Sequence, residues 1–514
     1  MSTSKLLIDT NVFIGLEDPK QVDPASAEIV RNCSEYTVGL FVHEAALRDI
    51  ARDRDDVRRK ISLSKFDKFQ RIKDPKPDPG TAELERLFGP IRKPNDEVDV
   101  ALLYALHLNI VDLLVTEDEG IHDRVRLGPL ADRVLRVPDA LVWLRRTYGA
   151  TPISLPFIDE RKAYEIDRAD PIFESLREGY PYFDVWWEKC VREHRECWVV
   201  TVDDQLAGLI VRKPETRAQA TVMLRGEKLL KLCTFKVQKD FRGEKLGELL
   251  LKQALWFAQV NAFDLVYLTT KADQTALISL LKYYGFEQTH SLGDEMVFEK
   301  MLMRDRLGMP PGEKDVFLVS RTNYPRFVAD PPAKAFCVPI QGNYHQKLFP
   351  ELAFEKPLPL FPNERRLVST DAARTPGNTI RKVYLCRAKT TSIAPGDILL
   401  FYHSKSAELA ASQSITSVGI VERITQTHDL EELIRLTAKR SVFSERELRE
   451  WIDASPSPVK VIDFLLVGHL SPPVRLETLK TEGVFGSHPP QSITALSPNR
   501  FALIRRRLAL GFEV

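Results

Sequence analysis

The sequence has 514 residues, and its 73 Lys and Arg balance 72 Asp and Glu, so the net charge of +1 gives no overall attraction to nucleic acid. A chain of this length exceeds one hydrophobic core, and roughly three domains are expected. The six cysteines form no CxxC pair, which argues against a zinc site or a disulfide framework. No signal-peptide layout and no apolar run of roughly twenty residues is present, which predicts a cytoplasmic protein with no membrane association.

Two breaks divide the chain. Residues 151–156 are Thr-Pro-Ile-Ser-Leu-Pro, and residues 308–312 are Gly-Met-Pro-Pro-Gly. Pro-rich and Gly-rich stretches of this kind interrupt regular structure and are typical of linkers. The sequence therefore predicts a multidomain α/β protein with domains at residues 1–150, 157–303 and 313–514.

The first domain alternates short apolar runs with helical patterns, which predicts a parallel sheet with crossover helices. Strands are expected at Leu6–Ile8 and Leu113–Val115, and helices around Phe41–Ile50 and Ala101–Leu108. The run Arg48–Lys60 mixes both charge signs, so it predicts a solvated helix face.

Acidic residues follow these strands and open these helices. Asp9 and Asp118 come just after the two strands, whereas Glu44 and Asp99 stand near the starts of helices. The carboxyl ends of parallel strands meet at one sheet edge, so these four acids are expected to converge. Clustered carboxylates repel unless a cation neutralises them, and hard divalent ions choose oxygen ligands. We therefore predict a site for Mg²⁺ or Mn²⁺ that activates water, with Asp96 as an alternative to Asp99.

This acid order resembles that of the PIN-domain nucleases over about residues 4–146. The resemblance implies a parallel α/β/α sandwich and a metal-dependent endoribonuclease. Because the family includes many toxin–antitoxin ribonucleases, it also implies either narrow specificity or a protein inhibitor (an antitoxin). The matching segments are Leu6–Asn11, Glu44, Asp99 with Ala101–Leu103, and Thr116–Asp118, and the implied catalytic and metal-binding residues are Asp9, Glu44, Asp99 and Asp118.

The second domain is expected to begin with a hairpin of Cys197–Val202 and Leu206–Arg212. A long strand at Leu229–Val237, a helix from about Gly243 to Val260, a strand at Leu265–Thr269 and a helix to Tyr284 follow. The turn Arg242–Gly247 joins the long strand to its helix. Free backbone N–H groups and the positive end of a helix dipole at such a turn suit a pyrophosphate.

The order of these elements resembles that of the GNAT acyltransferases over about residues 160–303, which implies an α+β mixed sheet and acetyl-CoA as cofactor. The Arg242–Gly247 turn resembles the pyrophosphate loop of the family, and Tyr284-Gly285-Phe286 resembles a late family element. The residues implied in cofactor binding are Phe235, Val237, Arg242, Gly243, Lys245 and Gly247.

Three positions of the second domain depart from the family pattern. Lys245 replaces the first glycine of the loop, Leu281 replaces a tyrosine that serves as acid, and Gln274 replaces an asparagine. Neither a general base nor a general acid can therefore be assigned from the sequence. Tyr283 and Tyr284 remain candidate proton donors, with packing in the core as their alternative role.

The third domain has many short apolar runs between turns and one helical insert near residues 429–453, which predicts a small β-barrel. It resembles the PUA-like superfamily, including its ASCH and EVE members, over about residues 330–508. The resemblance implies binding of RNA or modified bases. Tyr402, His403, Ser404 and Gln491 are candidates to line a nucleic-acid-binding pocket, and packing within the barrel is the alternative.

Three functions remain open. The first is a metal-dependent ribonuclease acting on structured RNA such as tRNA, assisted by an acetyltransferase or acetyl-CoA-sensing domain and an RNA-binding domain. The second is an acetyltransferase of an RNA-linked or protein amine with a subordinate nuclease. The third is a non-enzymatic regulator that binds nucleic acid. The sequence predicts no oligomeric state.

Overall fold

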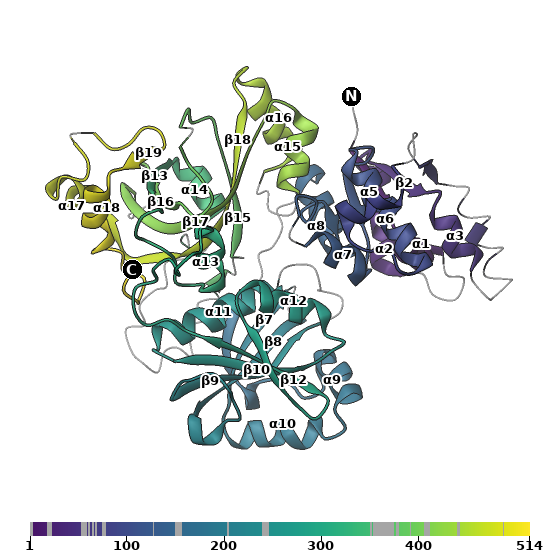
Figure 1. Cartoon of the computed structure of the whole chain (residues 1–514), viewed down its shortest axis with the longest axis horizontal. Helices are drawn as coiled ribbons and strands as arrows, with labels where there is room; N and C mark the ends of the chain where they lie inside the picture. The colour runs from purple at the N-terminus through teal and green to yellow at the C-terminus, as the bar shows by residue number, and fades with distance from the viewer. Residues whose placement is uncertain are drawn as a thin grey trace. The chain divides into compact units, whose positions relative to one another are not determined.

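The computed structural model forms two compact units, which are described separately below (Figure 1). The first comprises residues 1–153, 242–244 and 426–459, and the second comprises residues 154–241, 245–425 and 460–514. The structure describes residues 4–17, 23–52, 59, 62–63, 66, 69–74, 79–126, 128–149, 157–202, 205–238, 246–349, 352, 375–376, 380–390, 392–405, 412–438, 443–486 and 488–514.

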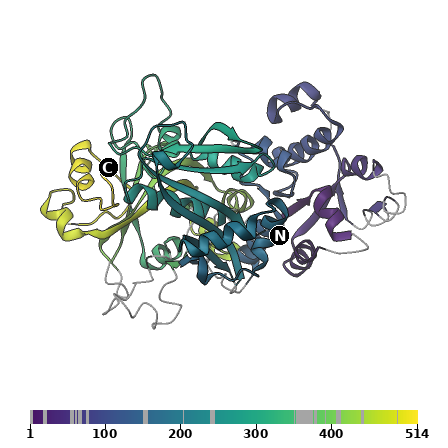
Figure 2. The ribbon, with the colours of Figure 1, turned by 90° about the horizontal axis from the view of Figure 1, so that it is seen from below.

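The first unit contains a parallel five-stranded sheet in the order β3-β2-β1-β4-β5. Its central strand β1 is apolar, and Leu6, Leu7 and Ile8 are fully buried because helices cover both faces of the sheet (Figure 2). The strands are β1 (Lys5–Ile8), β2 (Gly39–His43), β3 (Gln70–Ile72), β4 (Leu113–Val115) and β5 (Val134–Leu135).

Both strands predicted for the first domain are present, but the predicted helix around Phe41–Ile50 is wrong in its first half. Residues 39–43 form β2, which pairs between β1 and β3, and the helix begins only at Ala46. The run Gly-Leu-Phe-Val-His therefore forms a strand that is paired on both sides. The helices are α1 (Thr10–Glu17), α2 (Pro24–Glu35), α3 (Ala46–Ala51), α5 (Thr81–Phe88), α6 (Pro94–His107), α7 (Glu119–Val125) and α8 (Val137–Tyr148).

The helical insert predicted within the third domain is part of the first unit. It consists of α15 (Leu430–Thr437) and α16 (Glu445–Asp453). Arg435 donates to the Asp112 carboxylate at 2.8 Å, and both side chains are largely buried. Asp112 immediately precedes β4 and also accepts from the backbone N–H of Lys5 at the start of β1. The insert therefore contacts the amino ends of the strands, opposite the edge where Asp9 and Asp118 emerge.

The second unit contains an eight-stranded mixed sheet in the order β11-β12-β10-β9-β8-β7-β6-β14. The predicted hairpin is present as β7 and β8, and β9 and β10 form the one parallel pair among the described strands of this sheet. The strands are β6 (Phe157–Lys162), β7 (Glu196–Val202), β8 (Gln205–Thr216), β9 (Lys228–Val237), β10 (Leu265–Lys271), β11 (Glu287–Leu292), β12 (Glu295–Met301) and β14 (Thr375–Pro376).

Alternating residues of this sheet build two apolar layers. Helices α11 (Leu246–Val260) and α12 (Thr275–Tyr283) cover one face, and α10 (Phe183–Arg192) covers the other (Figure 1). Helix α9 (Glu174–Gly179) precedes α10 along the chain. Sequence and structure agree on these elements, except that the start of the predicted helix before Leu246 lies outside the described residues.

The third sheet is mixed and has the order β15-β18-β17-β16-β13-β19. Within the described residues, β15 and β19 are its edges, so the pairing does not close into the predicted barrel. Its strands are β13 (Ala335–Ile340), β15 (Arg381–Cys386), β16 (Ile398–His403), β17 (Ser414–Thr427), β18 (Val459–Arg475) and β19 (Thr494–Leu496), and the nearby helices are α13 (Val316–Thr322), α14 (Gly342–Leu348), α17 (Leu476–Thr481) and α18 (Pro498–Arg505).

The second and third sheets share an apolar core. Leu465 of β18 and Tyr324 are buried in the same cluster as the apolar side chains of α11 and α12. The Trp256 indole donates to the Val467 carbonyl at 2.7 Å. A Cβ at Gly468 would lie 2.2 Å from the Trp256 ring, so only glycine permits this approach. The second and third sheets therefore belong to one packed unit.

Candidate functional sites

Asp9 stands immediately after β1 and is 6% exposed. Its carboxylate accepts from the Thr10 backbone N–H at 2.5 Å and from the Thr116 hydroxyl at 2.6 Å. Burial raises the pKa of Asp9 to about 6, although the Thr116 hydrogen bond opposes the rise; the Asp118 and Asp49 carboxylates add to it. A nearby cation would stabilise the ionised form of a carboxylate that is buried among other negative charges.

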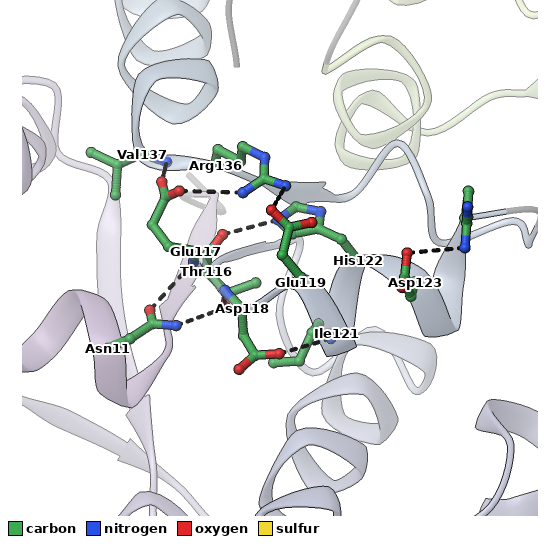
Figure 3. Close-up of polar contacts among 11 residues, drawn as sticks. Asn11, Thr116, Glu117, Asp118, Glu119, Ile121, His122, Asp123, Arg136 and Val137 are labelled. Carbon is green, nitrogen blue, oxygen red and sulfur yellow. Dashed lines mark hydrogen bonds and ion pairs between the residues drawn. The ribbon is translucent and has the colours of Figure 1, made fainter. Parts of the chain in front are cut away.

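Thr116 connects the two strand ends through hydrogen bonds, and Figure 3 shows this residue beside Asn11 and Asp118. Its hydroxyl accepts from the Asp118 backbone N–H at 2.9 Å and from the Asn11 amide at 3.3 Å while it donates to Asp9. Asp118 is the N-cap of α7, and one of its oxygens accepts from the Ile121 N–H at 3.2 Å. This network holds the Asp9 and Asp118 carboxylates at one edge of the sheet.

Asp99 joins Asp9 and Asp118, whereas Asp96 does not. Burial, followed by the Asp118 and Asp9 carboxylates, raises the pKa of Asp99 to about 7. Asp99 and Asp118 both lie near Gly120: a Cβ at that position would be 2.9 Å from an Asp118 oxygen and 3.9 Å from an Asp99 oxygen. Asp96 instead accepts from two backbone N–H groups before α6 and pairs with Arg124 at 3.2 Å. Asp96 is therefore a helix cap.

Glu44 lies in the turn between β2 and α3 and forms an ion pair with Lys73 at 3.7 Å. The acid that acts on both Asp9 and Asp99 from this part of the chain is Asp49. Asp49 accepts from the Thr10 hydroxyl at 3.4 Å and also pairs with Arg52. Sequence reasoning missed Asp49 because it lies in the charge run that predicted a solvated helix face.

Basic side chains contact the residues on either side of Asp118 in the sequence. Arg136 lies between Glu117 and Glu119, at 3.4 Å and 2.7 Å from their nearest oxygens (Figure 3). His122 forms a 3.0 Å hydrogen bond to the Thr116 carbonyl. Within the described part of the chain, no three His, Cys, Asp or Glu side chains already form a complete metal-binding group. Asp9, Asp99 and Asp118 thus lie close together without forming a complete set of metal ligands.

The second candidate site is a gap inside the eight-stranded sheet. β9 and β10 pair only from Leu229 to Lys231 and from Leu265 to Tyr267. β10 pairs with β12 along its whole length, and β9 pairs with β8 throughout apart from a bulge at Cys233. β9 and β10 therefore separate beyond this parallel pairing, at residues 232–237 of β9 and 268–271 of β10. Bulges and missing ladder partners leave backbone groups available to a ligand.

Three of the six residues expected to bind the cofactor lie in the part of the chain that the structure describes. Phe235 and Val237 lie on the part of β9 that extends beyond its pairing with β10, and they pack, partly buried, against the apolar core on the α11 side. Gly247 is in the first turn of α11, where a Cβ would lie 3.5 Å from Leu280. Arg242, Gly243 and Lys245 lie outside the described residues. The structure thus places Phe235, Val237 and Gly247 on the same side of the sheet.

The two candidate proton donors have structural roles. Tyr284 is fully buried, which raises its pKa well above that of a free phenol. The Tyr283 hydroxyl donates to Glu422 at 3.1 Å, and its ring contacts Arg321 and Arg381. Both tyrosines thus pack at the seam between the second and third sheets.

Two of the four residues predicted to bind nucleic acid, Tyr402 and His403, point to opposite faces of β16. Tyr402 is 1% exposed and lies in the apolar cluster that includes Leu400 and Ile398. His403 points to the opposite face of β16, where its ring stacks on His345 at 4.2 Å. Ser404 is partly buried just after the strand, and Gln491 is exposed. The alternative role for Tyr402, packing in the core, is the one that its position favours.

Residues 161–286 match the acetyltransferase (GNAT) family. This segment is about a quarter of the chain and contains the gap between β9 and β10. The chain therefore contains a GNAT acetyltransferase domain. No curated protein matches the chain. Within the described residues, every helix is too short or too polar to cross a lipid bilayer.

Several solved structures resemble parts of the chain. A mutant of the ZmASCH protein from Zymomonas mobilis is 15% identical, with 34% of this chain and 96% of that chain covered and a TM-score of 0.24. A putative GNAT acetyltransferase from Desulfovibrio desulfuricans is 17% identical, with 28% and 98% covered and a TM-score of 0.23. A GNAT acetyltransferase from Elizabethkingia anophelis with acetyl-CoA bound is 16% identical, with 28% and 98% covered and a TM-score of 0.22.

Proposed function

We propose that the domain at residues 161–286 binds acetyl-CoA and transfers its acyl group to an amine. This proposal rests on one observation. β9 and β10 separate after three residue pairs, whereas the other strand pairs of this sheet extend over nearly the full strand length. An extended thioester arm that enters this gap can hydrogen-bond to the backbone groups that lack a strand partner. The GNAT family match of the same segment supports the proposal.

Acetyl-CoA binding is tested by thermal unfolding of the full chain. A ligand that binds only the folded state at a concentration 100 times its dissociation constant stabilises the protein by about 2.7 kcal/mol. We expect acetyl-CoA to raise the melting temperature by several degrees and ADP alone to raise it less. An unchanged melting temperature at millimolar acetyl-CoA would contradict the proposal.

A second candidate function is metal-dependent phosphodiester cleavage by the first unit. The observation that favours it is the convergence of three acids: the Asp118 carboxylate raises the pKa of both Asp9 and Asp99, and the Asp9 carboxylate also raises that of Asp99. Carboxylate oxygens are the ligands that hard divalent cations such as Mg²⁺ or Mn²⁺ prefer, and Asp49 is a further acid that acts on both Asp9 and Asp99. A cation held there supplies water activation and neutralises charge on a phosphate. Thr116 and Asn11 keep Asp9 and Asp118 oriented toward it.

Structured RNA is the proposed substrate of this second activity, as the PIN resemblance implies, and a protein inhibitor is its proposed partner. The test is cleavage of total RNA by the full chain with Mn²⁺ or with EDTA. Asp9→Asn and Asp118→Asn keep side-chain size but remove the negative charge, so both should abolish Mn²⁺-dependent cleavage. Cleavage that survives both substitutions would contradict this function and leave the acetyltransferase proposal intact.

A further inference from the structure

Residues outside the acetyltransferase segment contact the start of helix α11. Glu248 lies in the first turn of this helix, and its carboxylate accepts from the backbone N–H of Arg381 at 2.8 Å. Arg381 begins β15 of the third sheet, where it pairs with Leu465 of β18. The family match ends at residue 286, so this contact to the first turn of α11 comes from a part of the chain that the match does not include.

Further contacts join the same two parts of the chain. The Arg381 guanidinium donates through Nε to Glu422 of β17 at 2.9 Å, and a second guanidinium nitrogen donates to the other Glu422 oxygen. The hydroxyl of Tyr283, the last residue of α12, donates to the same carboxylate at 3.1 Å. Helix α12 also packs against α11, because a Cβ at Gly247 would lie 3.5 Å from Leu280. These contacts close into a ring, the clamp, which consists of Glu248, Arg381, Glu422 and Tyr283.

The charges of the clamp are largely shielded from water. The Arg381 and Glu422 side chains are 21% and 14% exposed, and Glu248 is partly buried. Salt screens such charges less than fully exposed ones, and removal of one partner leaves the other uncompensated. Burial raises the pKa of Tyr284 at the end of α12; the Glu248 charge adds to this rise and the Arg381 charge opposes it. Both charges therefore act on the same part of the core beside α11.

The position of the Glu248 carboxylate matters for an anionic ligand. The free N–H groups at the start of a helix attract an anion such as a pyrophosphate. A carboxylate in the first turn stabilises the helix dipole, but it repels an anion bound at the same helix end. The hydrogen bond to Arg381 directs the Glu248 carboxylate to β15 and restrains the first turn of α11. Loss of this hydrogen bond should therefore loosen the turn and free the carboxylate to approach a bound pyrophosphate.

We propose that the third sheet sets the acetyl-CoA affinity of the acetyltransferase domain through the clamp, with Glu248, Arg381 and Glu422 as positioning residues. The inference rests on the proposed acyltransferase function. Strands β15 and β17 hold the first turn of α11 in the conformation that receives the pyrophosphate. Because coupling between two events is reciprocal, acetyl-CoA bound at this turn also strengthens the contact between α11 and β15. A displacement of β15 should weaken acetyl-CoA binding, which makes the third sheet a regulator of the transferase.

The clamp is tested by calorimetric titration of acetyl-CoA into variants of the full chain. Glu248→Ala removes the acceptor of the hydrogen bond, and Arg381→Met removes the guanidinium that links β15 to Glu422. Each should raise the dissociation constant by about five- to tenfold, within the usual range of coupling between sites. The double variant should bind no more weakly than the weaker single variant, because both changes act on the same turn. Glu248→Gln keeps an oxygen that can accept from the Arg381 N–H, so it should recover most of the lost affinity.

Arg423→Met is the matched control. Arg423 follows Glu422 on β17 and forms an ion pair with Asp463 at 2.8 Å, in which Asp463 is 1% exposed. Adjacent residues of a strand point to opposite faces, so this ion pair lies on the other side of the sheet from the clamp. Arg423→Met should lower the melting temperature of the ligand-free protein, as Arg381→Met does, because each leaves a buried carboxylate without its cation. Unlike Arg381→Met, it should leave the dissociation constant of acetyl-CoA unchanged.

The same titrations separate the clamp from the function on which it rests. If acetyl-CoA fails to bind the wild type, the acyltransferase proposal falls and the inference falls with it. If the wild type binds acetyl-CoA and Glu248→Ala binds it equally well, only the inference falls, even where Arg381→Met does not fold. Additive effects of Glu248→Ala and Arg381→Met would also overturn it. So would an equal loss of affinity in Arg423→Met, since that pattern indicates general destabilisation rather than positioning of α11.

Discussion

The first unit and the acetyltransferase domain both place polar groups at the carboxyl ends of parallel strands, but by different means. In the first unit the pairing of β1 with β4 is continuous to Ile8 and Val115, and side chains beyond the strand ends make the site. In the acetyltransferase domain the pairing of β9 with β10 stops at Lys231 and Tyr267, and the backbone itself opens. One site lies past an edge of a sheet, and the other lies within a sheet.

This difference decides which substitutions matter. A site made by carboxylates depends on their charges, so an isosteric change that removes one charge should have a large effect. A site made by a gap between strands depends on the positions of the strands, so packing changes should matter more than changes of the lining side chains.

Asp99→Asn should lower Mn²⁺-dependent RNA cleavage by roughly 100-fold or more, because a metal ion that stabilises a transition state is worth several kcal/mol. Asp96→Asn is the matched control three residues away. It weakens a helix cap and should cost about 1 kcal/mol of stability without loss of cleavage. The measurements are initial rates of cleavage and urea unfolding of each variant. A larger loss of cleavage in Asp96→Asn would reverse the assignment of the third acid.

The stability of the metal-free first unit should fall as the pH rises from about 4 to about 7. The pKa of Asp9 is raised to about 6 and that of Asp99 to about 7 in the folded state, so in this range the unfolded chain loses its protons first. These raised pKa values therefore contribute their full stabilisation of the folded state below about pH 4. The contribution is lost as the pH rises through the pKa values of the folded state. For buried Asp9 the change is about 3 kcal/mol.

Urea unfolding in EDTA at several pH values measures this slope. Asp9→Asn should reduce it, because the uncharged amide does not titrate. Mn²⁺ should restore stability near pH 7 in the wild type, since a bound cation favours the ionised carboxylates. A wild type whose stability rises between pH 5 and 7 in EDTA would contradict the proposed electrostatic origin.

The contrast between the two sites also explains what the sequence could predict. The convergence of Asp9, Asp99 and Asp118 could be predicted because acids that follow apolar strands or open helices have a characteristic spacing in the sequence. Asp49 could not be predicted, because its approach to Thr10 depends on where α3 begins, and the strand β2 was mistaken for helix. In the second domain the order of elements was predicted well, since alternation and turn residues are local.

Other features depend on contacts between distant segments and left no local pattern. Glu295 reaches Tyr180 across 115 residues of sequence, and Trp256 reaches Val467 across 211. Tyr402 resembled a pocket residue because an aromatic residue at a strand end has the same local pattern whether it is buried or exposed. Whether such a residue is buried depends on the elements that pack against its strand, which for Tyr402 form the apolar cluster around Leu400.

Gly468→Ala should destabilise the second unit by about 1–3 kcal/mol, the usual cost of overpacking a core. The added Cβ would lie 2.2 Å from the Trp256 ring and push α11 away from β18. Because α11 lies beside the gap, acetyl-CoA affinity should fall as well. Gly486→Ala is the control, since nothing lies within 4 Å of a Cβ at that position. Thermal unfolding and acetyl-CoA titration measure both effects, and equal behaviour of the two variants would argue against a shared core.

Cys233→Ala should have the smallest effect, a change in acetyl-CoA affinity of less than about twofold. Cys233 is the extra residue of the β9 bulge, at the level where β9 leaves β10. Its thiol accepts a 3.6 Å hydrogen bond from Arg195 on the face opposite α11, so the side chain points away from Phe235 and Val237. Alanine keeps the bulge, because bulge geometry is a property of the backbone register. Calorimetric titration of acetyl-CoA into both proteins tests this, and a tenfold loss would show that the thiol, rather than the backbone gap, determines binding.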